Sequence, residues 1–178
     1  MNTFLTQTVD TRNGPRGLLA IDPGTTVSAW LFMTPRPDSM QWDIGEFGID
    51  ANKDVLALCR NHRDGLVIEW IEGQGQVVGK ETFETCRWIG RFMQAYAHPE
   101  EVTMLTRRAE KLHLCNTNSA KDPNIRQALL DIYGPKGTKK EPGATYGISK
   151  DVWSALAVAT THLNITPLNY RRRETPSA

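Results

Sequence analysis

Residues 18–32 read LLAIDPGTTVSAWLF, two apolar runs that meet at an acidic turn. The runs predict two buried strands, and Pro23 with Gly24 predicts a tight turn that folds the second strand back on the first. Asp22 then ends the first strand, where a buried carboxylate needs a compensating charge such as a metal ion. Aspartate also favours the start of such a turn by itself, so this stretch alone leaves both interpretations of Asp22 open.

The bulk properties are those of one globular domain. The chain has 178 residues, 39% of them hydrophobic, which is enough for a real core. No segment approaches the length of a membrane span, so we expect no membrane partner. Three widely spaced cysteines predict neither a disulfide framework nor a zinc site, and a reducing cytoplasm is expected. We assign the domain to residues 17–163, between a polar segment (1–16) and a basic, flexible tail (164–178).

Charge is distributed unevenly along the chain. The first 102 residues contain 9 basic and 14 acidic side chains, and the remainder contains 12 and 6, although the formal net charge is only +1. Such an arrangement suits a protein that binds metal with its first part and phosphate with its second. A chance distribution of solvated charges is the alternative.

The remaining pattern predicts alternating strands and helices, and hence an α/β fold. Short turns between the first three strands imply an antiparallel meander. Residues 134–147 collect glycine, proline and lysine without periodicity and predict an irregular basic loop. Further strands are expected at residues 40–49, 65–72 and 102–106, and helices at residues 52–63, 79–98, 123–133 and 149–162, the last with Ser149 as its N-cap.

Two more acids are candidates for a site shared with Asp22. Glu69 interrupts an apolar strand, where an unpaired carboxylate has no structural purpose. Glu72 lies three positions further and would point to the opposite face, so a solvated strand end is its simpler interpretation. Asp151 stands at the start of the last helix, where the helix dipole stabilises an acid in any protein.

The expected helix at residues 79–98 is unusually apolar. Its apolar arc is wider than one face of a sheet requires, so either a second protein surface covers it or the helix is fully buried. Self-association through this helix is therefore one prediction. The polar side chains form a single stripe: Lys80, Glu84, Arg87, Arg91 and Gln94.

The chain resembles RuvC-like Holliday junction resolvases of the RNase H-like nuclease superfamily. The resemblance rests on four segments in this order: IDPG (21–24), IE (68–69), KD (150–151) and ALAVATTH (155–162). Three further segments look most like the phage and prophage branch of these resolvases: VGKE (78–81), FETCRWIGRF (83–92) and KDPNIRQAL (121–129). The resemblance implies a five-stranded mixed sheet with helices on both faces. It also implies a homodimer that nicks four-way or other branched DNA symmetrically with divalent metal, Mg²⁺ or Mn²⁺, as two ions per active site.

By position, Asp22, Glu69 and Asp151 match the family's carboxylates, and Lys111 matches a basic residue near its cleavage site. Two ions held by such acids activate water and stabilise the leaving 3′ oxygen. The family commonly has another acid one turn after Asp151, where this chain has Ser154. A further ligand is then expected from Ser154 itself, weakly, or from Glu72 or Asp122, and loss of cleavage is the alternative.

Basic side chains of the later segments and of the apolar helix are the candidate DNA contacts: Arg87, Arg91, Arg107, Arg108, Lys121, Lys136, Lys139 and Lys140. Other functions compete with junction cleavage. An RNase H-like nuclease for flaps or RNA is one, because fold does not fix substrate, and a junction-binding protein that no longer cuts is another. The turn at residues 21–26 also looks like the first phosphate loop of the actin, Hsp70 and sugar-kinase ATPases, but those need two such lobes.

Overall fold

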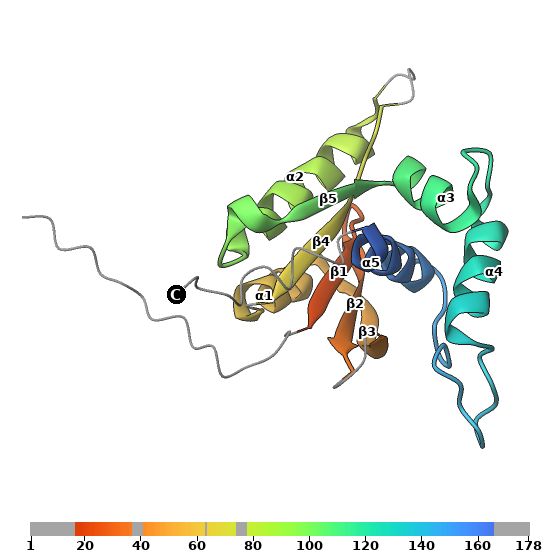
Figure 1. Cartoon of the computed structure of the whole chain (residues 1–178). Helices are drawn as coiled ribbons and strands as arrows, with labels where there is room; N and C mark the ends of the chain where they lie inside the picture. Colours follow the sequence, from red (N-terminus) through yellow and green to blue (C-terminus); the bar gives the residue numbers. More distant parts are fainter. Residues whose placement is uncertain (1–16, 37–40, 63, 74–77, 166–178) are drawn as a thin grey trace, which may run out of the picture.

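The computed structural model describes residues 17–36, 41–62, 64–73 and 78–165. The expected polar segment at residues 1–16 and the basic tail from residue 166 onward lie outside these ranges. Figure 1 shows one sheet with helices on both of its faces and two further helices beside it.

The sheet has five strands in the order β3-β2-β1-β4-β5. Strands β1 (Leu18–Asp22), β2 (Val27–Pro35) and β3 (Trp42–Ala51) form the expected antiparallel meander, whereas β4 (Gly65–Trp70) is parallel to β1 and β5 (Thr103–Thr106) is parallel to β4. The predicted mixed α/β sheet is confirmed. The central strand β1 is apolar up to its last residue because helices cover both of its faces.

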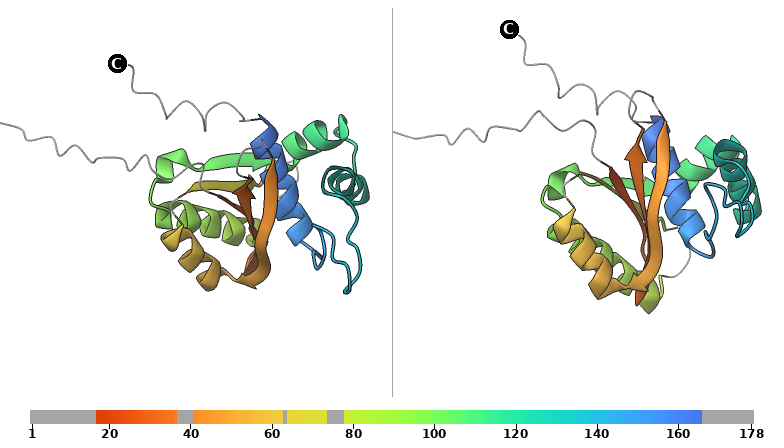
Figure 2. Two further views of the ribbon diagram at one scale, coloured as in Figure 1. Left: turned by 60° about the horizontal axis from the view of Figure 1, so that its bottom comes forward. Right: turned by 90° about the horizontal axis from the view of Figure 1, so that it is seen from below.

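One face of the sheet is covered by α1 (Asn52–Asn61) and α2 (Lys80–Ala95), and the other by α5 (Val152–Ile165), as the edge-on view in Figure 2 shows. Helices α3 (Arg107–Cys115) and α4 (Asp122–Tyr133) lie beyond α5, and the short 3-10 helix η1 (Pro99–Glu101) precedes β5. No helix within the described ranges is long and apolar enough to cross a membrane.

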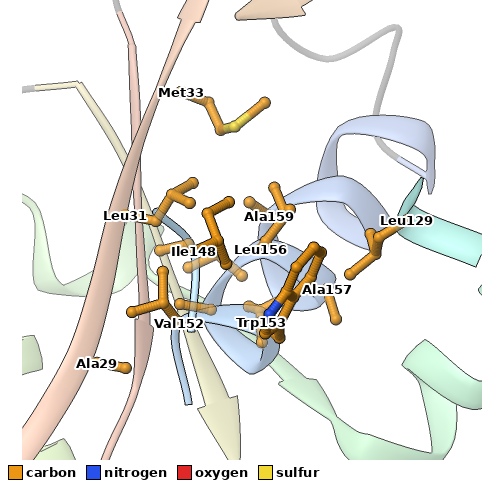
Figure 3. Close-up of a cluster of buried hydrophobic side chains, with 14 of the residues drawn as sticks. Ala29, Leu31, Met33, Leu129, Ile148, Val152, Trp153, Leu156, Ala157 and Ala159 are labelled. Carbon is orange, nitrogen blue, oxygen red and sulfur yellow. The ribbon is translucent and has the colours of Figure 1, made fainter. Parts of the chain in front are cut away.

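Two cores follow from the alternation of side chains along the strands. On one face, Leu19, Ile21 and Ile68 pack with α1 and α2. On the other, Leu18, Ala20 and Val67 pack with α5, whose buried alanines allow a close approach to the sheet. Figure 3 shows this second core, where Ile148 and Leu156 lie toward Leu31 of β2 and Trp153 lies toward Leu129 of α4.

The last helix begins later than the sequence predicts. It runs from Val152 rather than from Ser149, so Ser149 is not its N-cap. Lys150 adopts a left-handed conformation (φ 47°), which interrupts helical geometry just before this point. The backbone carbonyl of Asp151 accepts the first helical hydrogen bonds, from the amides of Ser154 and Ala155 at 2.9 and 3.1 Å.

Candidate active site

Asp22 and Glu69 lie side by side at the carboxyl ends of two parallel strands. The register pairs Ile21 of β1 with Ile68 of β4, so the next residue on each strand is an acid. Both acids share the α5 face of the sheet with Ala20 and Val67, because side chains alternate with a period of two. The two carboxyl groups affect each other directly: the charge of Glu69 raises the pKa of Asp22, whereas hydrogen bonding with Asp22 lowers that of Glu69.

The turn after Asp22 is fixed by a buried polar network. The Ser28 hydroxyl accepts from the Gly24 amide at 3.2 Å and donates to the Asn52 side-chain oxygen at 2.7 Å. The Asn52 amide in turn donates to the Gly24 carbonyl at 3.0 Å. Ser28 and Asn52 are each 1% exposed, so this network ties the turn beside Asp22 to the start of α1.

Gly24 also has a steric role in this turn. A Cβ atom at that position would lie 2.3 Å from the carbonyl oxygen of Val27, closer than nonbonded atoms approach. The turn that positions Asp22 therefore requires glycine.

Helix α5 brings two residues to the same place. Asp151 precedes the helix and is exposed, and its charge acts on Asp22. The half-buried Ser154 hydroxyl hydrogen-bonds to the Asp22 carboxylate. The family that this chain resembles commonly has an acid at the position of Ser154. In this protein Ser154 orients Asp22 instead.

Helix α3 contributes an acid that the sequence did not single out. Glu110 is 0% exposed, and its Oε2 accepts a hydrogen bond from Arg107 Nη1 at 2.8 Å. Arg107 also contacts Asp122 at the start of α4, at 2.6 Å. One guanidinium thus links α3 to α4 within a group of acids.

The structure raises the pKa of three of these acids well above their ordinary values. Burial, together with the charges of Glu69 and Asp151, raises the pKa of Asp22 to about 8 against the opposing effects of Arg107 and Ser154. Burial and repulsion by Glu110 raise the pKa of Glu69 to about 7, although Arg107 and the hydrogen bond with Asp22 oppose the shift.

Glu110 behaves in the same way. Burial raises the pKa of Glu110 to about 7, with Asp22 and Asp122 adding to the effect while Arg107 opposes it. Neighbouring carboxyls in a low dielectric cannot all be ionised unless a cation joins them. Oxygen ligands of this kind suit Mg²⁺ or Mn²⁺, so the donor set fits the metal expected from the sequence.

The other two acids predicted as metal ligands, Glu72 and Asp122, are more exposed than Asp22 and Glu69. Glu72 is exposed, two residues after β4 ends, and the Asp122 carboxylate is 83% exposed and already paired with Arg107. Among the described residues, one trio of metal-binding side chains has all its ligand atoms within 4.8 Å: the exposed His98, Glu100 and Glu101 near η1. Exposed acids gather in this way without metal, so we assign that trio no role.

The predicted DNA-contacting residues occupy different environments. Arg108, Lys121, Lys139 and Lys140 are exposed on α3, on α4 and in the basic loop. Lys136 instead donates to the Ile148 carbonyl at 2.7 Å and lies 5.3 Å from the centre of the Trp153 ring.

On α2, the predicted polar stripe is confirmed as the less buried side of the helix. Arg87 lies 3.3 Å from Glu84, and the Arg91 guanidinium stacks 4.1 Å from the centre of the Trp88 ring. The assignment of these arginines to DNA contacts stays a prediction.

Lys111 lies one turn after Arg107 on α3, so these two basic residues share a face of the helix, whereas Glu110 directly precedes Lys111. Lys111 is half-buried and forms no ion pair with any residue that the structure describes. Its role in cleavage stays a prediction.

These features define an RNase H-like α/β protein with acids at the carboxyl ends of its parallel strands. The fold is that of RuvC and other Holliday junction resolvases. Neither a family model nor a curated protein sequence matches the chain. The likeness to the phage branch stays a prediction.

Three solved structures illustrate the similarity. RuvC of Thermus thermophilus superposes with a TM-score of 0.62 at 15% identity, over 82% of this chain and 92% of that one. The yeast mitochondrial Holliday junction resolvase Ydc2 gives 0.55 at 11% identity, over 86% and 80% of the two chains. The fowlpox virus Holliday junction resolvase gives 0.51 at 12%, over 84% and 99%. At these identities the likeness establishes the fold, and function has to be argued from the site.

Proposed function

We propose that this protein is a Holliday junction resolvase, a metal-dependent endodeoxyribonuclease that nicks four-way or other branched DNA symmetrically as a homodimer. The observation that carries the proposal is the pair of half-buried carboxyls where β1 and β4 end, on a RuvC-like fold. T. thermophilus RuvC has also been solved with a Holliday junction substrate, with a TM-score of 0.61 to this chain at 16% identity. That complex supports branched DNA as the substrate.

In this proposal Asp22, Glu69 and Asp151 hold the ions, Mg²⁺ or Mn²⁺. When bound, two such ions activate a water for attack on phosphorus and stabilise the leaving oxygen. The Ser154 hydroxyl orients the Asp22 carboxylate by its hydrogen bond. The buried network of Ser28 and Asn52 keeps the Asp22 turn in place.

The DNA is proposed to contact the basic side chains of α3, α4 and the loop that follows. Arg108, Lys121, Lys139 and Lys140 are exposed and free to meet phosphates without breaking the core. Lys136 and Arg107 already have partners within the protein, so for them a phosphate contact requires exchange of those partners. Lys111, on the same face of α3 as Arg107, is proposed to stabilise charge at the scissile phosphate.

A second copy of the chain is proposed to pack against α2. Phe83 on the first turns of α2 is 65% exposed, and Trp70 and Val78, which flank the connection from β4, are 41% and 45% exposed. A contiguous patch of exposed apolar side chains marks an interaction surface, and these three side chains are proposed to belong to one.

Sedimentation velocity at micromolar concentration tests the dimer. We expect a dimer that Phe83→Asp weakens, whereas Ile132→Asp, a control at a 52% exposed position on α4, leaves it intact. A monomer that still cuts junctions symmetrically would contradict this part of the proposal.

The nuclease is tested with a panel of four-way junction, flap, duplex DNA and RNA duplex, each with and without Mg²⁺. We expect metal-dependent, symmetric nicks in the junction, and none after Asp22→Asn, Glu69→Gln or Asp151→Asn, while junction binding persists. Equal cleavage of flap or RNA would favour the more general nuclease. Tight junction binding without cleavage would favour the binding protein that the serine at position 154 suggests.

We place the activity in the cytoplasm, of a bacterium or of a phage-infected cell, where the three free thiols stay reduced.

A further inference from the structure

Glu110 holds a buried oxygen that the protein leaves without a partner. The residue is 0% exposed, and only its Oε2 is satisfied, by Arg107 at 2.8 Å. Its Oε1 has no hydrogen-bond partner among the described residues. A buried polar atom left unpaired costs about 1–3 kcal/mol, and more when the group is charged, so its retention calls for an explanation.

The backbone places the start of α3, and hence Glu110, next to the ends of β4 and β5, although the ligand oxygens of Asp22, Glu69 and Glu110 do not all lie within 4.8 Å of one another. Helix α3 begins directly where β5 ends, and the Thr106 hydroxyl caps it by accepting from the Ala109 amide at 3.2 Å. Since β5 pairs with β4 and Leu105 lies opposite Glu69, the first turn of α3 begins beside the acids. The charges of Glu110 and Glu69 act on each other, and that of Asp22 acts on Glu110.

We propose that Glu110 provides a carboxylate ligand for a divalent cation bound by Asp22 and Glu69, so that α3 supplies the acid that α5 lacks at Ser154. The inference rests on the proposed function, because it concerns the same site. It differs from the ligand set expected from the sequence, in which Glu72 or Asp122 would fill this role.

Geometry favours Glu110 over both alternatives. Asp122 is exposed and its carboxylate is held by Arg107, and Glu72 lies in the exposed segment after β4. Glu110 alone combines full burial with an oxygen that lacks a partner within the described part of the chain. Arg107, bound to the other oxygen, keeps the Glu110 carboxylate in place and offsets part of its charge.

Binding of Mn²⁺ to the metal-free protein, without DNA, tests this inference by isothermal titration calorimetry. The variants are Glu110→Gln, which removes the charge, and Glu110→Asp, which keeps the charge but withdraws the carboxylate by one methylene. We expect both to weaken Mn²⁺ binding at least about tenfold, as loss of a supporting group at a metal site does. Asp131→Asn is the control, because Asp131 is an exposed acid on α4 outside this group of acids, so its substitution should leave Mn²⁺ affinity nearly unchanged.

A thermal unfolding scan in EDTA accompanies the titration. Glu110→Gln removes a buried like charge and also the charge with which Arg107 pairs, so the scan establishes that the metal-free variant is folded at the temperature of the titration. If Glu110→Gln fails to fold, the comparison of Glu110→Asp with Asp131→Asn decides the question.

Two results would overturn the inference. Unchanged Mn²⁺ affinity in Glu110→Gln would exclude any contact with the ion. Full affinity in Glu110→Asp would show that Glu110 acts through its charge alone. These outcomes are separable from failure of the proposed function: a protein that cuts junctions although Glu110→Gln binds Mn²⁺ normally refutes only the ligand. A protein whose Mn²⁺ binding depends on Glu110 but which cuts no DNA refutes only the nuclease.

Discussion

The metal-free protein should lose stability as pH rises through the range in which its buried acids ionise. Burial raises the pKa of Asp22 from 3.8 to about 8, so the folded state keeps a proton that the unfolded chain has already released at pH 7. Wherever the folded state binds more protons, the free energy of unfolding falls with pH. The stability gained from this proton is lost as pH passes through the folded pKa.

The size of the effect follows from the shift. About four pKa units at ~1.4 kcal/mol each set an upper limit of about 6 kcal/mol for the cost of ionising Asp22 in the folded protein. That is comparable with the whole stability of a domain, about 5–15 kcal/mol. Between pH 7 and 8.5 the expected loss is about 1–2 kcal/mol, with Glu69 and Glu110 adding at the lower end of the window. Burial lowers the pKa of His62, and that of His162 to about 4, so both imidazoles are largely neutral there.

Urea unfolding at pH 7.0, 7.5, 8.0 and 8.5 checks this, once with EDTA and once with saturating Mg²⁺. We expect the downward slope in EDTA only, because a bound cation keeps the acids ionised throughout. Asp22→Asn should flatten the slope, and Glu46→Gln, at an exposed position on β3, should not. Unchanged stability in EDTA between pH 7 and 8.5, or the same slope in Asp22→Asn, would refute the reasoning.

Three further predictions concern the DNA contacts and the turn. Lys111→Ala should lower the single-turnover cleavage rate more than junction affinity, and equal losses would make Lys111 an ordinary phosphate contact. The double substitution of Lys139 and Lys140 by alanine should reduce the slope of log affinity against log salt by ~1.8, about 0.9 for each phosphate contact, and an unchanged slope would place both lysines off the DNA. Gly24→Ala should destabilise the fold by about 1–3 kcal/mol in urea unfolding and reduce cleavage, because its Cβ would clash with the Val27 carbonyl. Unchanged stability and cleavage would show that the turn tolerates a side chain.

Asp22 and Glu69, the two site residues on strands, could be predicted because their signal is local in the sequence. A carboxylate that ends or interrupts an apolar run is visible in sequence, and both Asp22 and Glu69 are of this kind. Their shared face also follows from the alternation of side chains along parallel strands. The antiparallel meander of the first three strands was expected from the short turns between them, whereas the five-stranded mixed sheet was implied by the resemblance.

The contribution of α3 could not be read in this way. Glu110 sits between Ala109 and Lys111 in a polar stretch, where an acid normally faces solvent. Its burial is a tertiary effect, because α3 starts at the end of β5 and packs against α4 and α5. The spacing of Arg107 and Glu110 on one helical face was the one available signal, and surface ion pairs produce it just as often.

Acidic side chains outnumber basic ones at the edge of the sheet where β1 and β4 end. Five carboxylates act on one another at this edge of the sheet, from Asp22, Glu69, Glu110, Asp122 and Asp151, and one guanidinium, that of Arg107, opposes them. Bound divalent cations would balance this excess of negative charge. The excess also explains why an arginine belongs inside an acidic site: without metal, Arg107 and shared protons are what keep these acids together. The approach of a DNA phosphate would add negative charge, so metal and DNA should bind cooperatively, and Mn²⁺ affinity measured with junction present should exceed that of the free protein.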